Sequence, residues 1–290
     1  MIAPDNRFTG IYKCRNRELL IGKKTLIMGI LNCTPDSFSD GGRYTALDSC
    51  IKQAQLMVES GCDVIDIGGE ATNPKVKPIS AEEEISRIVP VITALRERYD
   101  IPLSVDTYKA EVAKAALECG CDIINDITGL LGDPEMAKTV ASYNAGVIVM
   151  FNSRTYGASE NDPDCDILKR AEDELLMSIE KAHEAGIPDD YIMTDPGIGF
   201  GTGRDQDGIL TKGVSRLGFG GKYPVLYAAS RKRYVKALAG KENVTEAELD
   251  QITAGLSVTA AAAGAAMVRV HDVACSRMAL NAFDSAFYGS

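Results

Sequence analysis

Polar side chains that could bind a ligand follow several of the apolar runs in this sequence. Two carboxylates and one amide stand at the ends of such runs, at Asp106, Asn125 and Asp195. These acceptor-rich groups suit a flat heterocycle with N–H and NH2 donors, because an ionised carboxylate can accept two hydrogen bonds side by side from a guanidine-like edge. Lys232 could add a donor for a carbonyl or a nitrogen of the ring. The sequence therefore predicts a site for a polar heterocycle.

A second group of candidate residues is cationic or neutral and polar. Arg269 and His271 share the end of one apolar run, and their N–H donors suit phosphate oxygens. Asn32 ends the first run and offers a carbonyl oxygen to a hard metal ion such as Mg2+. A heterocycle bound deep in the protein, with a pyrophosphate nearer the surface, would fit both groups.

Each of these residues also has a structural explanation. A single Asp after a strand is a helix N-cap more often than a catalytic residue. For Asp106 taken alone, a capping role and a binding role are about equally good explanations. Asp126 and Asp272 are interpreted as helix caps or supporting residues. His183 lies within a charged helical stretch and is predicted to be a solvated surface residue.

Eight short apolar runs alternate with amphipathic stretches along the whole chain. The runs are apolar throughout rather than alternating with polar residues, which is typical of parallel strands buried on both faces. The predicted strands cover residues 25–31, 63–68, 101–106, 122–126, 146–151, 191–195, 223–228 and 267–270. Helical patterns cover residues 46–61, 80–99, 110–120, 166–186 and about 272–288.

Eight strand–helix units predict an α/β fold, a (β/α)8 TIM barrel that forms a single domain over residues 1–290. The alternating segment 10–24 is predicted to be a short N-terminal hairpin that closes the bottom of the barrel. An open, doubly wound sheet is the alternative, but no G-x-G-x-x-G motif follows the first strand. Because the carboxyl ends of barrel strands form the active site, this fold would bring the polar strand ends to one face.

Composition narrows the class of protein. The net charge of −10 argues against a nucleic-acid partner, so an anionic ligand would need a local cluster of cations. No apolar run approaches the roughly 20 residues of a membrane span, and the first residues lack the layout of a signal peptide. The eight cysteines show no zinc-site spacing and are expected to be reduced and structural. We therefore expect a cytoplasmic protein without membrane contact.

Six segments carry a resemblance to a known family. They are MGILNCTPDSFSDGG (28–42), GGEATNP (68–74), INDITG (124–129), DPGIGFG (195–201), SRK (230–232) and RVHDV (269–273). In this order and spacing they resemble the dihydropteroate synthases, the pterin-binding (β/α)8 enzymes of folate biosynthesis. The resemblance extends over residues 24–288, and the first and last segments are its most specific parts.

The resemblance implies a reaction and its participants. The enzyme would condense 6-hydroxymethyl-7,8-dihydropterin pyrophosphate with p-aminobenzoate, forming 7,8-dihydropteroate and releasing pyrophosphate. It would need Mg2+ and would act as a homodimer. The glycine-hinged first loop would fold over the pyrophosphate and exclude water, then reopen to release the product. No nucleophilic side chain is required, because the amine attacks directly.

The resemblance also implies a role for each matching residue. Asn32 would hold Mg2+ and the pyrophosphate, whose oxygens Arg269 and His271 would bind. The residues that would hold the pterin are Asp106, Asn125, Asp195 and Lys232. The p-aminobenzoate site would be shaped by Phe38, Thr72, Pro74 and Ser230. The residues expected to carry catalysis are Asn32, Lys232, Arg269 and His271.

The sequence departs from the family pattern in four places. Asn73 replaces an Arg of the second loop, Phe151 replaces a His, Thr202 replaces a Lys, and Ala228-Ala229 replaces Gly-Thr. These changes gather around the expected site of the second substrate. The alternative is therefore a paralogue that joins the pterin to another amine or only binds it. A corrinoid-dependent methyltransferase is a more distant alternative, since it would not need the first loop.

Arg154 offers a replacement for the cation missing at Asn73. It lies on the loop after the fifth predicted strand, next to the expected second-substrate site. Our hypothesis is that its guanidinium takes over the role of the second-loop Arg.

Overall fold

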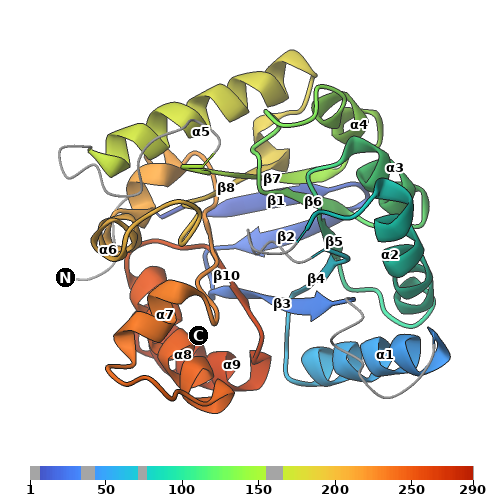
Figure 1. Cartoon of the computed structure of the whole chain (residues 1–290). Helices are drawn as coiled ribbons and strands as arrows, with labels where there is room; N and C mark the ends of the chain where they lie inside the picture. The colour runs from blue at the N-terminus through green and yellow to red at the C-terminus, as the bar shows by residue number, and fades with distance from the viewer. Residues whose placement is uncertain (1–6, 34–42, 71–76, 155–165, 290) are drawn as a thin grey trace.

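The computed structural model describes residues 7–33, 43–70, 77–154 and 166–289. Its centre is a sheet of eight parallel strands, and helices surround this sheet (Figure 1). The strands are β3 (Leu26–Asn32), β4 (Val64–Gly68), β5 (Leu103–Asp106), β6 (Ile123–Asp126), β7 (Gly146–Met150), β8 (Ile192–Asp195), β9 (Leu226–Tyr227) and β10 (Met267–Val270). Each of them lies within one residue of, or inside, a predicted apolar run.

The sheet closes into a barrel. Hydrogen bonds join the strands in the order β8-β7-β6-β5-β4-β3-β10-β9. Thr194 of β8 then forms an isolated parallel bridge with Val225, and its N–H donates to the carbonyl of Pro224 over 3.0 Å. This contact joins the two ends of the sheet, so the predicted (β/α)8 architecture is confirmed.

Nine α-helices lie among the described residues and cover the outside of the barrel (Figure 1). They are α1 (Arg43–Glu59), α2 (Ala81–Arg96), α3 (Ala110–Glu118), α4 (Met136–Ser142), α5 (Ile167–Glu184), α6 (Arg204–Lys212), α7 (Arg233–Leu238), α8 (Glu246–Ala262) and α9 (Val273–Tyr288). Local capping defines several of their starts; the Ser80 hydroxyl, for example, accepts the N–H of Glu83 at the start of α2. Among the described residues, no helix combines the length and apolar character needed to cross a membrane.

A hairpin of β1 (Gly10–Cys14) and β2 (Arg17–Ile21) covers the amino-terminal end of the barrel. Its inward side chains include Tyr12 and Ile21, which pack in one buried cluster with Met28 and Val64 from inside the barrel. Burying these apolar side chains is the main force that holds the hairpin in place. The predicted closure of the barrel bottom by a hairpin is confirmed.

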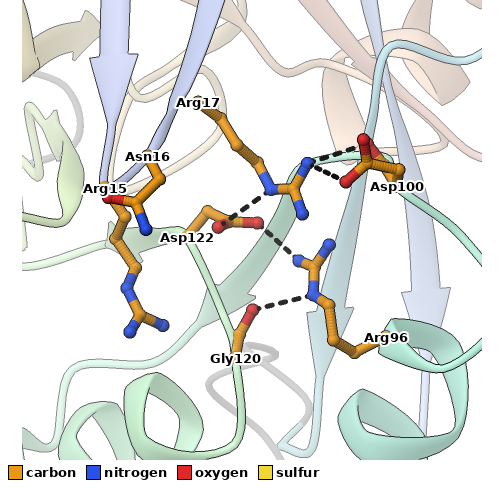
Figure 2. Close-up of a pocket in the computed structure, with 7 residues that line it drawn as sticks. All are labelled: Arg15, Asn16, Arg17, Arg96, Asp100, Gly120 and Asp122. Atoms are coloured by element: carbon orange, nitrogen blue, oxygen red, sulfur yellow. Dashed lines mark hydrogen bonds and ion pairs between the residues drawn. The ribbon is translucent and has the colours of Figure 1, made fainter.

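A polar pocket of about 440 Å3 lies beside residues 15–17, at the turn of this hairpin (Figure 2). Asp122 is its centre, and it accepts from Arg17 Nε over 3.2 Å and from Arg96 Nη2 over 2.5 Å. Arg15 donates to the backbone carbonyls of Leu117 and Cys121 over 2.9 and 3.0 Å. These contacts tie the hairpin to the barrel at the end opposite the carboxyl ends of the strands.

The described cysteines agree with the expected reduced state. All seven within the described ranges are free thiols, and five of them are buried. Cys33 follows β3 at its carboxyl end, but its Sγ lies 3.6 Å from that of Cys50 in α1, in the packing between the barrel and this helix.

Candidate functional site

Arg269 occupies the centre of the carboxyl end of the barrel. It extends from β10, and its Nε donates to Asp66 Oδ2 on β4 over 2.6 Å. Its Nη2 donates to Asp106 Oδ2, at the end of β5, over 2.7 Å. Asp106 therefore does not act as a helix cap, because its carboxylate turns into the barrel toward the guanidinium. Among the described residues, the hydrogen bonds of this guanidinium use Nε and Nη2 and leave out Nη1.

Asp66 is a site residue that the sequence analysis did not assign. Its side chain is fully buried, and Asn125 Nδ2 donates to its Oδ2 over 3.3 Å. Its Oδ1 is buried and has no hydrogen-bond partner within the described part of the chain. A buried carboxylate oxygen without a donor is costly, so this atom points to a ligand that supplies an N–H. The available signal was the charge of Asp66 in the middle of an otherwise apolar strand.

Asp195 is oriented by the loop that follows β8. Its Oδ1 accepts the N–H of Gly197 over 2.7 Å. Gly197 has φ +67°, and a Cβ there would lie 1.8 Å from the carbonyl oxygen of Phe151. Only glycine fits this close approach, which holds the loop against β7. The ring of Phe151 is 1 % exposed and belongs to the core, so the position where the family pattern has a His offers no polar group here.

Lys232 reaches the same loop from the other side. It precedes α7, and its Nζ donates to the carbonyl of Ile198 over 2.9 Å. The ammonium also lies 4.5 Å from the centre of the Phe200 ring, within range of a cation–π interaction. The loop from Pro196 to Gly203 therefore brings Asp195 and Lys232 to one side of the site.

Burial shifts the pKa values of three ionisable groups that line the site. Burial raises the pKa of Asp106 to about 7, although the charge of Arg269 opposes this rise. Burial also raises the pKa of Asp195. Burial lowers the pKa of Lys232 to about 8, against the charge of Asp195. Groups perturbed in this way are characteristic of functional sites.

His271 is held in one orientation by Ser230. The Ser230 hydroxyl oxygen accepts the backbone N–H of His271 over 3.2 Å and lies 2.8 Å from its Nδ1. We assign the hydroxyl proton to the Nδ1 contact, which leaves the ring proton on Nε2. Burial, with the charges of Arg231 and Arg269, lowers the pKa of His271 to about 4. The imidazole is therefore a neutral donor through Nε2 at physiological pH.

Asn32 ends β3 at the same face, and its side chain is exposed. Within the described ranges, no group of three or more His, Cys, Asp or Glu residues could hold a metal ion. A single amide oxygen nevertheless suits Mg2+, which commonly binds one or two protein oxygens and completes its shell with phosphates and water. Asn32 therefore fits a metal that is bound together with a phosphorylated substrate.

The structure separates the binding candidates from the capping residues. Asp272 accepts the N–H of Cys275 and caps α9. Asp126 caps no helix; it accepts the N–H groups of Thr128 and Leu130 and supports the turn after β6, the other role that was predicted for it. His183 lies on the surface, where Nε2 is 2.8 Å from Asp189. The expected p-aminobenzoate residues outside the described ranges are Phe38, Thr72 and Pro74, together with Asn73, which departs from the pattern.

Comparison with known proteins is consistent with this site. The family model described as "Pterin binding enzyme" matches residues 28–271. A dihydropteroate synthase of Streptococcus pyogenes serotype M1 is 45 % identical over 258 residues, which cover 88 % of this chain and 93 % of that protein. The enzyme of the same name from Bacillus subtilis is 42 % identical over 268 residues, covering 91 % of this chain and 90 % of its own.

Solved structures agree in both fold and sequence. The Xanthomonas albilineans dihydropteroate synthase with 4-aminobenzoic acid has a TM-score of 0.88 and 34 % identity, covering 96 % of this chain and 98 % of that one. A structure of the enzyme from the same organism in complex with 7,8-dihydropteroate has a TM-score of 0.82 and 31 % identity, covering 95 % and 98 %. This chain belongs to the dihydropteroate synthase family of pterin-binding enzymes.

Proposed function

We propose that this protein is a dihydropteroate synthase, which condenses 6-hydroxymethyl-7,8-dihydropterin pyrophosphate with p-aminobenzoate. The observation that carries the proposal is the acceptor cluster at the carboxyl end of the barrel, in which Asp66 and Asp106 accept from Arg269. Asn125 joins this cluster by donating to Asp66. The cluster matches the donor-rich edge of a pterin, and it lies in a chain that belongs to the corresponding family.

The pterin would bind deep in the barrel. Its guanidine-like edge would donate to the carboxylates, and the unpartnered Oδ1 of Asp66 would gain a donor. Asp195 and Lys232 would contact the ring from the side of the loop after β8. Binding in this pose would place the reactive methylene toward the mouth of the barrel.

Charge develops on the pyrophosphate as its bond to the methylene carbon breaks and the bond to the amine nitrogen forms. Arg269 Nη1 and the neutral Nε2–H of His271 would donate to the departing oxygens. Mg2+, held by Asn32 and the phosphates, would neutralise part of this charge when bound. These donors are held in place before the reaction, so little reorganisation is needed.

The identity of the second substrate is the finer part of the proposal. Support for p-aminobenzoate comes from relatives that carry the family name and from the 4-aminobenzoic acid bound in one of them. The departure at Asn73 keeps another amine as the alternative. Arg154 lies near the loop after β8, where Nη2 donates to the carbonyl of Gly199 over 3.3 Å and the guanidinium carbon is 5.3 Å from the centre of the Phe200 ring.

The decisive experiment measures pyrophosphate release by the purified protein with Mg2+ and the pterin pyrophosphate, with and without p-aminobenzoate. Release that depends on p-aminobenzoate, together with dihydropteroate identified by mass, is the expected result. Pterin binding without such release would contradict the proposal and favour the paralogue; a screen of other aromatic amines would then follow. Omission of Mg2+ is expected to abolish release.

We further propose that the protein acts as a homodimer in the cytoplasm, as the family resemblance implies. The free cysteines of the described residues support a reducing compartment. Light scattering should give about twice the chain mass of 31.1 kDa, and a monomer at micromolar concentration would contradict the dimer. Recovery of the native protein in the cytosolic fraction, with a marker enzyme as control, tests the location.

A further inference from the structure

The peptide unit between Ile198 and Gly199 is held from both sides. Its carbonyl oxygen accepts from Lys232 Nζ over 2.9 Å. Its N–H donates to Asp207 Oδ1 over 2.9 Å and to Thr202 Oγ1 over 3.1 Å. This peptide is trans, as are the others in the described residues, so its C=O and N–H point in opposite directions. Lys232 and Asp207 therefore lie at opposite ends of one planar group.

This peptide lies in the middle of a turn over residues 197–200, in which the Phe200 N–H donates to the carbonyl of Gly197 over 3.0 Å. Gly199 has φ +79°, and Gly197 and Gly201 also have positive φ values. Glycine tolerates this positive φ, but rotation of the 198–199 plane would also change ψ of Ile198, which is fully buried. A rotation that turned the carbonyl away from Lys232 would also remove the N–H from Asp207. The two hydrogen bonds are thus coupled through the rigid peptide.

Asp207 and Thr202 form a buried pair that accepts the N–H of Gly199. Asp207 lies on α6 and is 2 % exposed, and Thr202 is fully buried. The Thr202 hydroxyl donates to Asp207 Oδ1 over 2.5 Å, which fixes that oxygen toward Gly199. A buried carboxylate is tolerated only when it is hydrogen-bonded, so these donors also account for its presence.

We propose that Asp207, together with Thr202, is a positioning residue for Lys232. It orients the 198–199 peptide so that the carbonyl of Ile198 holds the Lys232 ammonium in the pterin site. This inference deepens the proposed function and rests on it, since it takes Lys232 to be a pterin ligand. It also gives a role to Thr202, which replaces the Lys of the family pattern.

The chain contains a matched control at the other end of the barrel. Asp284 is also 2 % exposed, and its carboxylate accepts the N–H and the hydroxyl of Thr25 over 2.8 and 2.9 Å. Thr25 is fully buried, as Thr202 is. The Asp284–Thr25 pair has the same chemistry but lies next to the start of β3, far from the carboxyl ends of the strands. Substitutions there report the structural cost of losing such a pair.

The test compares Asp207→Ala with Asp284→Ala, and Thr202→Val with Thr25→Val. Calorimetry measures the dissociation constant of 6-hydroxymethyl-7,8-dihydropterin from pH 6 to 9.5, and thermal unfolding is followed in parallel. We expect Asp207→Ala to weaken binding about tenfold, the value of a lost hydrogen bond to a charged group. Thr202→Val should weaken binding about threefold, and Thr202→Ser should restore it. Both controls should lower the melting temperature without changing the affinity of the folded protein.

Asp207→Asn separates charge from geometry. The amide keeps an acceptor for Gly199 but removes the negative charge that supports the Lys232 ammonium. The loss of pterin affinity at high pH should therefore begin at lower pH in this variant than in the wild type. The variants at positions 207 and 202 could instead keep the wild-type pterin affinity and pH profile, while their melting temperatures fall as in the controls. That result would show that Asp207 and Thr202 have only a structural role.

The pterin titration does not depend on the second substrate, so the two proposals can fail separately. The wild-type protein could release no pyrophosphate with p-aminobenzoate, while Asp207→Ala still weakens pterin binding. This result would contradict the proposed synthase activity but support the positioning role of Asp207. Pterin affinity that is unchanged in Lys232→Met would overturn the positioning role even if the synthase activity is confirmed. If Asp207→Ala fails to fold, Thr202→Val decides the question.

Discussion

Arg269 and Asp106 form a 2.7 Å ion pair across the inside of the barrel. They come from β10 and β5, between which β3 and β4 lie in the sheet, so the guanidinium must extend through the barrel rather than along one strand. Asp66 accepts from the Nε of the same guanidinium, so a single cation neutralises part of the charge of two carboxylates.

The first prediction concerns this shared cation. Arg269→Lys should lower kcat/KM by a factor on the order of 100 to 1,000, because an ammonium cannot make both contacts and still present a donor to the leaving group. Steady-state kinetics of pyrophosphate release measure the effect. Arg216→Lys is the control: Arg216 makes a similar two-point contact with Glu172 on the surface, and its replacement should have little effect. Wild-type kinetics in Arg269→Lys would contradict the assigned role.

The second prediction is a maximum of pterin affinity between about pH 7 and pH 8. Below pH 7 Asp106 gains a proton and can no longer accept two hydrogen bonds, so affinity falls as the pH decreases. Above pH 8 Lys232 loses its charge, so affinity falls as the pH increases. Calorimetric titration with a pterin that lacks phosphate tests both limbs. Asp106→Asn should remove the acid limb and Lys232→Arg the basic one, whereas a flat profile would exclude both assignments.

The third prediction is that His271 remains neutral, with its proton on Nε2, down to about pH 5. Burial and the nearby arginines disfavour its charged form, and the Ser230 hydroxyl donates to Nδ1. The chain has two histidines, so nitrogen-15 NMR of labelled His183→Gln protein reports His271 alone. Ser230→Ala should mix the tautomers and reduce kcat about tenfold, while Ser230→Thr should keep both properties. A spectrum with the proton on Nδ1 would refute the arrangement.

The fourth prediction concerns the loop that carries the pterin site. Gly197→Ala should destabilise the protein strongly, because the new Cβ would lie 1.8 Å from the carbonyl oxygen of Phe151. Gly186→Ala is the matched control: its φ is +89°, but no atom lies within 4 Å of the Cβ position, so it should cost only the backbone strain of about 1 kcal/mol. Urea unfolding of both variants measures the difference, and equal losses would show that the loop moves freely away from β7.

The fifth prediction tests the replacement of the missing loop cation. Arg154→Ala should raise the KM for p-aminobenzoate several-fold with little change in pterin affinity, because the guanidinium lies on the Gly199–Phe200 side of the site and not on the acceptor cluster. Kinetics with varied p-aminobenzoate at saturating pterin pyrophosphate measure the change. If turnover and amine affinity are both unaffected, Arg154 does not replace the Arg that is absent at Asn73.

The strand β9 is shorter than its apolar sequence pattern predicts. Residues 223–228 read as one apolar run, yet the strand spans only Leu226–Tyr227. Pro224 has no N–H to donate to a neighbouring strand. Val225 forms an isolated bridge to β8, and its carbonyl accepts from the N–H groups of Ala266 and Met267, so the regular ladder begins only at Leu226. The run keeps its buried place in the barrel but not the ladder of hydrogen bonds that defines a strand.

The sequence by itself determined the eight strands, five of the nine helices in the described part of the chain (α1, α2, α3, α5 and α9), and the face where the polar strand ends meet. Uninterrupted apolar runs are stable only when both faces are covered, and alternation with helices requires parallel connections. It could not show that Asp66 shares Arg269 with Asp106, that Ser230 orients His271, or that Asp207 reaches the peptide of Gly199. The contacts of Arg269 join residues 203 and 163 positions apart, and they exist only because the barrel closes in one register. Spacing along the chain carries no information about such distances, so only the tertiary structure decided which partners these side chains have.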